Sequence, residues 1–156
     1  MDWKKSIFKV LIRGHRGLQR LLGAATVGVR ILVVNSEQEI LLVEHTYIDG
    51  WHFPGGGVNH MESTEAAAIR ELQEETGVIA KNISFFQIYV HNILGVSDYP
   101  ALYVVTNFEV QADAKPSPEI KHAKWFKITD LPKDTTDSTK MRLSEYFEQK
   151  QKADRW

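Results

Sequence analysis

The stretch from Gly55-Gly56-Gly57 to Gly77-Val78 decides the fold, because a glycine turn there leads into a helix that breaks a local rule. The helix contains a run of good helix formers, Glu65-Ala66-Ala67-Ala68-Ile69-Arg70-Glu71-Leu72-Gln73-Glu74-Glu75. Ser63 or Thr64 can cap its N-terminus. Gly77 is the expected left-handed residue just past its C-terminus.

Three carboxylates of this helix fall on one face near its C-terminal end. Glu71, Glu74 and Glu75 stand at positions i, i+3 and i+4, and the last two lie where the helix dipole favours a cation. Each like-charge pair destabilises the helix by about 0.2–0.5 kcal/mol, and each misplaced charge by about 0.3–1 kcal/mol. A bound divalent cation would remove that cost. Oxygen ligands with no cysteine or paired histidine nearby indicate Mg²⁺ or Mn²⁺ rather than Zn²⁺; the alternative is a solvated acidic helix face.

The spacing of the whole stretch decides between these two interpretations. Gly56 is followed after five residues by Glu62, and after seven more by the run from Arg70 to Val78. This pattern resembles a complete Nudix box, the signature of the Nudix hydrolase family, over the 23 residues from Gly56 to Val78. A lone glycine-rich turn would be a weak signal, whereas a motif with every defined position filled is a specific one.

The resemblance implies an enzyme that uses water and a divalent metal to cleave a pyrophosphate bond in a nucleoside diphosphate derivative. It implies that Glu74 and Glu75 are metal ligands, and that Glu71 is a ligand or the base that takes the proton from water. The backbone carbonyl of Gly55 is a further expected ligand. The expected cofactor is Mg²⁺ or Mn²⁺, which would neutralise phosphoryl oxygens and lower the pKa of the attacking water.

Arg70 and Glu62 complete the motif. The resemblance implies that they form an internal ion pair that orients the carboxylates, so that Glu62, Arg70, Glu71 and Glu74 make up the expected catalytic set. Without the motif, a solvated charge on the helix would be the favoured interpretation of Arg70.

Three residues outside the motif are candidate substrate contacts: Arg30, His45 and Glu119. Arg30 lies in an otherwise apolar strand and could meet a phosphate, or lie at an edge with its charge in water. His45 stands near the place where family members often carry an arginine after paired leucines, although single histidines are usually structural. Glu119 is the candidate for the late-loop base or ligand of many family members, with an exposed carboxylate as the alternative.

The substrate is expected to be a small nucleotide derivative, either a nucleoside triphosphate or a nucleotide sugar. Marks of particular Nudix subfamilies are mostly missing from the sequence. Tyr47, Trp51 or Tyr89 could stack on a base, with burial in the core as the alternative for each. A catalytically weak nucleotide-binding module is a second reading, but it predicts a lost carboxylate in the motif, and none is lost.

The N-terminal residues, from about Trp3 to Leu22, have the pattern of an amphipathic helix with six basic side chains against the single acidic Asp2. Such a helix can lie on an anionic membrane surface. More often it packs on its own domain or on a partner subunit, as in a homodimer, and we favour packing. The expected division is a helix over residues 1–23 and a Nudix hydrolase domain over residues 24–156.

Length and composition agree with one globular domain. The chain has 156 residues and a net charge of −1, which argues against a protein that grips DNA or RNA duplexes through their backbones. The chain has no cysteine, which excludes disulfides and thiolate chemistry. No apolar run approaches the roughly 18–20 residues of a membrane span, so a cytoplasmic protein is expected.

The remaining pattern predicts strands over residues 25–34, 40–45, 83–93, 99–110 and 121–128, and a C-terminal helix that starts at Thr136 or Asp137. The strand over residues 40–45 is expected to return beside the first one. Mixed strands with a central and a flanking helix predict an α/β sandwich. The resemblance implies the same architecture, a Nudix-type α/β/α sandwich with a mixed sheet, a central catalytic helix, a C-terminal helix and an extra N-terminal amphipathic helix.

Overall fold

The computed structural model describes residues 25–112 and 117–156, so the predicted helix over residues 1–23 lies outside the described part. The described chain contains these elements, in order: β1 (Thr26–Val33), β2 (Glu39–His45), β3 (Trp51–His52), α2 (Thr64–Thr76), β4 (Val78–Ala80), β5 (Ser84–Ile88), β6 (His91–Ile93), β7 (Val96–Val105), β8 (Phe108–Val110), β9 (Ile120–Lys127), the 3-10 turn η1 (Ile128–Asp130) and α3 (Asp137–Phe147).

The predicted mixed sheet is present, and the described strands form two further sheets. One sheet has the order β1-β7-β5, with β6 also paired to β7; a second has the order β3-β2-β9; β4 and β8 form a two-stranded ribbon. The pairing of β1 with β7 is parallel. All the other pairings between named strands in the described chain are antiparallel.

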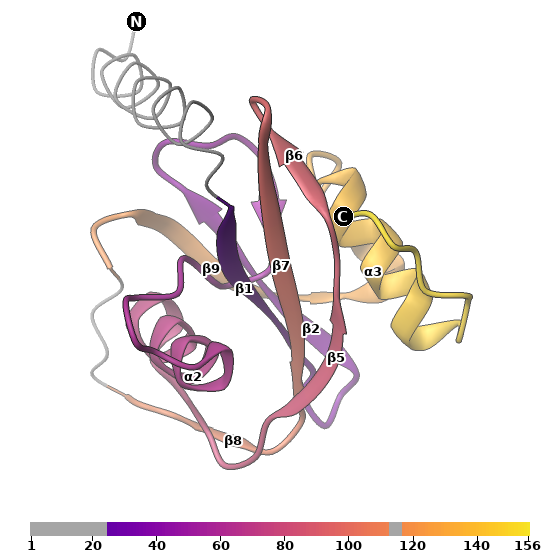
Figure 1. Cartoon of the computed structure of the whole chain (residues 1–156). Coiled ribbons are helices and arrows are strands. Elements are labelled where there is room, and N and C mark those ends of the chain that lie inside the picture. The colour runs from indigo at the N-terminus through magenta and orange to yellow at the C-terminus, as the bar shows by residue number, and fades with distance from the viewer. Residues whose placement is uncertain (1–24, 113–116) are drawn as a thin grey trace, which may run out of the picture.

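The helices cover the strands from two sides, α2 on one and α3 on the other (Figure 1). Beneath α2, Ala67, Ala68 and Leu72 pack on alternate residues of β1 and on β7. Leu143 of α3 belongs to a second apolar cluster, with Leu32, Leu42 and other side chains. Because β1 carries apolar side chains on both faces, it serves both cores. The predicted α/β sandwich is therefore confirmed.

The prediction that the second strand returns beside the first is wrong. β1 and β2 lie in different sheets and are joined by an isolated bridge between Val34 and Ile40. Both edges of β1 are already used. One edge carries β7 over eight residue pairs, and the other bonds to the glycine loop, through Ile31 N–H to Pro54 and Val29 N–H to Gly56.

The two long strands predicted on either side of residues 95–98 are each divided. The first breaks at Tyr89–Val90, where the backbone of Val90 bonds to Asp154 instead of continuing the ladder. The second begins earlier, at Val96, because the turn falls at Leu94 (φ 55°) and Gly95 (φ 84°). It ends at Val105, and β8 pairs with β4 in a separate ribbon.

The helix boundaries agree with the sequence analysis. The Ser63 side chain accepts a hydrogen bond from the N–H of Ala66 at the start of α2, and Gly77 follows its end with φ 70°. Thr136 caps α3 in the same way. Within the described ranges, the structure contains no helix long and apolar enough to cross a membrane.

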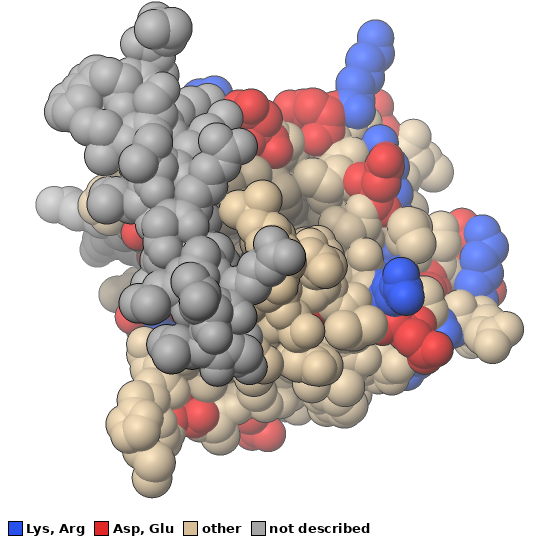
Figure 2. All heavy atoms as spheres, turned by 45° about the horizontal axis from the view of Figure 1, so that its top comes forward, with Lys and Arg blue, Asp and Glu red and all other residues tan. Residues whose placement is uncertain are grey.

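Charged side chains are interspersed on the face of the molecule shown in Figure 2. Acidic and basic groups alternate around a largely uncharged surface. The described part of this face has no continuous basic strip.

Candidate active site

The glycine loop after β3 is fastened along the edge of β1. The Gly56 carbonyl accepts a hydrogen bond from Val29 N–H at 2.9 Å, and Val58 N–H donates to the Val27 carbonyl at 3.2 Å. Gly55 has φ 142°, and a Cβ there would lie 2.1 Å from the Val29 carbonyl oxygen. Only glycine allows the backbone to come this close to the strand.

The same loop receives two carboxylates from α2. A Cβ at Gly56 would lie 2.5 Å from the carboxyl group of Glu71, so the missing side chain makes room for that group. One turn further on, Glu75 Oε2 accepts a hydrogen bond from Gly55 N–H at 2.8 Å. The spacing i, i+4 puts both carboxylates on the face of the helix that meets the loop.

Glu75 is buried, with 6% of its surface exposed. Burial raises the pKa of its carboxyl group to about 7, and the nearby charges of Glu71 and Glu119 act in the same direction. The Gly55 N–H and the positive charge of Arg30 oppose that rise. A cation close to this carboxyl group would stabilise its ionised form.

Arg70 joins three carboxylates of the motif. Its Nε and Nη2 donate to Glu62 at 2.8 and 2.9 Å, and its Nη1 donates to Glu71 at 2.7 Å and to Glu74 at 3.2 Å. Nη2 also donates to the Gly57 carbonyl at 3.1 Å. The predicted Glu62–Arg70 ion pair is thus present. Chiefly because of Arg70, the pKa of Glu62 is lowered to about 2.

The three adjacent carboxylates of the motif are not equivalent. Glu75 is buried, and the side chain of Glu71 is 16% exposed. The Glu74 side chain is 56% exposed and is held on the surface by Arg70. Glu71 and Glu75 are therefore the pair that the fold presents at the glycine loop.

His45 lies on the other side of Glu75. Its Nδ1 is 3.9 Å from Glu75 Oε1 and has no hydrogen-bond partner among the described residues. Burial, together with the nearby His52 and Arg30, lowers the pKa of His45 to about 4. The imidazole is therefore neutral at pH 7 and leaves a buried nitrogen facing the carboxylate.

The remaining two candidate residues lie close to the same region. Arg30 is half-buried on β1, donates from Nη1 to the Val29 carbonyl at 2.8 Å, and lies near enough to Glu75 to lower the pKa of its carboxyl group. Glu119 is exposed and accepts a hydrogen bond from Tyr47, whose pKa is raised by burial first and by Glu119 second. Arg30, His45 and Glu119 are thus all brought towards Glu75.

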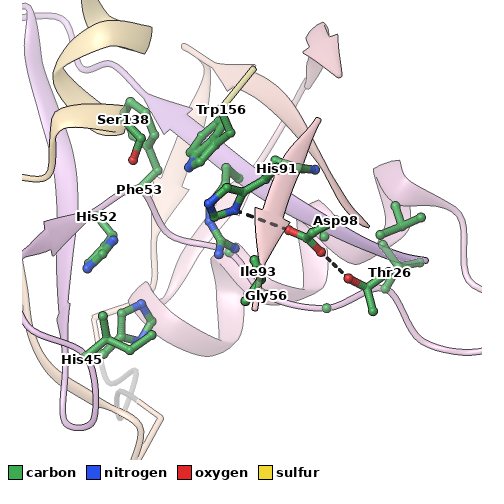
Figure 3. Close-up of a pocket in the computed structure, with 18 of the residues that line it drawn as sticks. Thr26, His45, His52, Phe53, Gly56, His91, Ile93, Asp98, Ser138 and Trp156 are labelled. Carbon is green, nitrogen blue, oxygen red and sulfur yellow. Dashed lines mark hydrogen bonds and ion pairs between the residues drawn. The ribbon is translucent and has the colours of Figure 1, made fainter. Parts of the chain in front are cut away.

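A cavity of about 960 Å³ lies beside the glycine loop (Figure 3). Gly55 and Gly56, which contact the two carboxylates, lie on its wall, as do Arg30 and His45. Tyr47 also lines the cavity. By contrast, Trp51 and Tyr89 are 8% and 1% exposed and belong to the core.

The opposite side of the cavity is lined by residues that were not predicted from the sequence. His91 and Asp98, from β6 and β7, lie 4.0 Å apart between Nδ1 and Oδ2, and Thr26 donates to Asp98 Oδ1. Trp156 completes this wall (Figure 3). No spacing in the sequence signals the set, because parallel pairing of β1 with β7 places Thr26 opposite Asp98.

The donor set at the glycine loop fits a hard divalent cation. Glu71 and Glu75 supply carboxylate oxygens, and the Gly55 carbonyl accepts no hydrogen bond from the described residues. No three acidic or histidine side chains in the described ranges form a ready-made cation site. Mg²⁺ is usually bound by one or two carboxylates, with water and substrate phosphates as its remaining ligands.

Comparison with known proteins identifies the family. A model of the NUDIX domain matches residues 24–147, and the chain belongs to the Nudix hydrolase family. It is 30% identical over 121 residues to a putative 8-oxo-dGTP diphosphatase of Bacillus subtilis, an alignment that covers 78% of this chain and 79% of that protein. It is 35% identical over 115 residues to the m7GpppN-mRNA hydrolase dcap-2 of Caenorhabditis elegans, covering 69% of this chain.

The fold is also that of solved family members. A MutT NUDIX hydrolase from Burkholderia pseudomallei matches with a TM-score of 0.69 at 24% identity, covering 78% of this chain and 98% of that one. The alignment with the nematode protein spans 14% of that protein. The activity of the whole nematode protein is therefore not attributed to this chain.

Proposed function

We propose that this protein hydrolyses a pyrophosphate bond in a small nucleotide, a nucleoside triphosphate or a nucleotide sugar, with a divalent cation as cofactor. The observation that carries the proposal is the buried Glu75, bonded to Gly55 N–H beside Glu71 and next to a cavity of about 960 Å³. A buried carboxyl group with a raised pKa beside a second one is a costly arrangement. A cation bound to oxygens of both carboxylates would offset that cost.

Glu71, Glu74, Glu75 and the Gly55 carbonyl would hold the cofactor, Mg²⁺ or Mn²⁺, with Glu71 either a ligand or the base for the attacking water. When bound, the metal would screen the phosphoryl oxygens and lower the pKa of that water. Arg70 and Glu62 fix the carboxylates through the contacts of the Arg70 guanidinium. One of these contacts, from Arg70 Nη1, is to the Glu71 carboxylate that lies beside Gly56.

Arg30 and His45 would contact the substrate. Arg30 is a half-buried cation in the cavity wall, suited to a phosphate oxygen. His45, neutral at pH 7, offers a buried ring nitrogen. Glu119, exposed and bonded to Tyr47, would act as an additional acidic group.

A small substrate is favoured over a nucleic acid duplex. The cavity has the volume of a site for a small molecule, and charges of both signs are interspersed on the face in Figure 2. The two relatives named above carry substrate names of nucleotide type, a nucleoside triphosphate and a capped RNA. A pyrophosphate bond next to a nucleoside is common to both.

The test is a panel of nucleoside triphosphates and nucleotide sugars assayed with Mg²⁺ and with Mn²⁺, for the wild type and Glu75→Gln. The amide oxygen of glutamine can still accept the Gly55 N–H bond but cannot supply a carboxylate. We expect a rate at least two orders of magnitude lower for the variant. Hydrolysis that is equally fast in both proteins, or absent from the whole panel, would contradict the proposal and favour a catalytically weak binding module.

A further inference from the structure

Trp156 is held in the cavity wall by its own backbone. It belongs to the segment after α3, residues 148–156, which has neither helix nor strand of its own. Asp154 accepts a hydrogen bond from Val90 N–H at 2.8 Å, and Trp156 N–H donates to the Val90 carbonyl at 3.1 Å. The segment is thus fastened to the break between β5 and β6.

A buried arginine fixes the segment from inside. Arg142 is fully buried; its Nη1 donates to the Arg155 carbonyl at 2.9 Å and its Nη2 to Glu145 Oε1 at 2.8 Å. Glu145 also accepts hydrogen bonds from Ala153 N–H at 2.9 Å and from the Tyr89 hydroxyl at 2.8 Å. Burying such a pair is costly, and two of its bonds end on the segment that carries Trp156.

The indole ring itself is oriented by its neighbours. Its centroid lies 5.4 Å from that of Tyr89, with the ring planes at 71°, and the Arg142 guanidinium carbon lies 5.6 Å from the Trp156 ring centroid. The side chain keeps partial exposure and lines the cavity. An aromatic ring that is fixed on one side and open on the other can stack on a ligand. Little side-chain conformational entropy is then lost on binding.

Polar side chains line the same cavity as the Trp156 ring. Figure 3 shows His91 between Trp156 and Asp98 on one side of the cavity, with His45 on another side. Asp98 is 9% exposed and is fixed by Thr26. A ring to stack on and a hydrogen-bond acceptor, Asp98, that line the same cavity fit a nucleobase, which has a π face and N–H donors at its edge.

We propose that Trp156 stacks on the base of the substrate and is a specificity-determining residue of this site. This inference rests on the proposed function, which places the phosphates at the glycine loop. It narrows the substrate class to compounds with an aromatic base. Substrates that offer only phosphate and sugar or polyol groups would leave the Trp156 surface without a partner.

Binding can be tested without catalysis, because the chain has four tryptophans and stacking quenches indole fluorescence. The full chain and Trp156→Phe are titrated with GMP in the absence of metal, with inorganic phosphate as the base-free probe. We expect GMP to quench the wild type, with at least half of the quenching lost in Trp156→Phe, and phosphate to quench neither. Equal quenching of the two proteins by GMP would overturn the proposal.

Kinetics supply the second readout. For Trp156→Ala we expect KM for a hydrolysed nucleotide to rise about tenfold or more while kcat changes less than about threefold. Trp156→Phe should keep most of the wild-type KM. Trp125→Ala is the matched control, because Trp125 stacks on Phe108 at 5.5 Å and does not line the cavity.

The outcomes separate this inference from the proposed function. Hydrolysis that depends on Glu75 but has the same KM in Trp156→Ala leaves the proposed function standing and overturns the role of Trp156. A change in KM of equal size in the Trp125→Ala control would overturn it as well. If the wild type hydrolyses no nucleotide, the proposed function fails, and the fluorescence titration still decides whether Trp156 binds a base.

Discussion

The carboxylate of Glu75 accepts a hydrogen bond from Gly55 N–H at 2.8 Å, which ties the end of α2 to the loop at the edge of β1. Gly55 is confined on its other side by the Val29 carbonyl, 2.1 Å from where a Cβ would stand. The helix, the loop and the strand are thus fixed to one another at this residue. The geometry of the candidate site depends on backbone packing as much as on the carboxylates.

Alanine at Gly55 should destabilise the fold. The new Cβ would meet the Val29 backbone and the residue would keep φ near 142°, which side chains rarely adopt. We expect a loss of at least about 2 kcal/mol in the free energy of unfolding, measured by urea denaturation. Gly57→Ala is the control, since nothing lies within 4 Å of its Cβ position; equal stability of the two variants would contradict the prediction.

Alanine at Gly56 should affect activity more than stability. Its Cβ would lie 2.5 Å from the Glu71 carboxyl group, and that group, at the end of a flexible side chain, can swing away. We expect a loss of at least about tenfold in kcat, with less than about 1 kcal/mol lost in the free energy of unfolding. Steady-state kinetics and urea denaturation of the same preparation measure both. A variant with full activity would show that the position of Glu71 does not matter.

Removal of divalent cations should lower thermal stability. A ligand that binds only the folded state stabilises it by about 2.7 kcal/mol at 100 times its Kd, which corresponds to a rise of roughly 5–10 °C in Tm for a chain of this size. We expect Mg²⁺ to produce such a rise, EDTA to reverse it, and Glu75→Gln to lose most of it. Differential scanning calorimetry makes the measurement, and an identical Mg²⁺ response in Glu75→Gln would argue against a cation at this carboxylate.

Helix α2 could be predicted from the sequence because its signals are local. Ser63 and Gly77 stand at the two ends of a run of helix formers, and the structure uses both as caps. The resemblance to the Nudix box also implied the Glu62–Arg70 pair, which is formed by two hydrogen bonds. Signals of this kind depend only on residues that lie close together in the sequence.

The strand pairing, and the cavity wall that contains Asp98 and Trp156, could not be predicted from such local signals. β1 pairs with β7 rather than with the adjacent β2, because the glycine loop and β7 occupy its two edges. Asp98 reaches the cavity through that pairing, and Trp156 through the backbone bonds of its segment with Val90 and the contacts of the buried Arg142. The sequence spacing also did not distinguish Glu71, Glu74 and Glu75 from one another. In the structure Glu75 is buried, whereas Glu74 is exposed.

The Glu62–Arg70 pair should make stability depend on acid pH. The pKa of Glu62 falls from its usual 4.5 to about 2 in the folded chain, chiefly through its hydrogen bond from Arg70. A lowered pKa means that the folded state gains stability above pH 4.5 and loses it as the pH falls towards 2. The difference in unfolding free energy between wild type and Glu62→Gln should therefore be constant above about pH 5.5 and shrink below pH 4.5. Urea titrations across this range measure the difference, and parallel curves down to pH 2 would contradict the prediction.

The buried pair of Arg142 and Glu145 should show strong coupling. Arg142→Met removes the cation and leaves the Glu145 carboxylate among buried groups, with its bonds from Tyr89 and Ala153 but without its ion-pair partner. We expect that single change to cost roughly 3–5 kcal/mol of unfolding free energy. Adding Glu145→Gln should recover part of the loss, because the amide needs no counter-ion. Urea denaturation of the wild type, both single variants and the double variant closes the cycle, and strictly additive losses would show that the two side chains do not act as a pair.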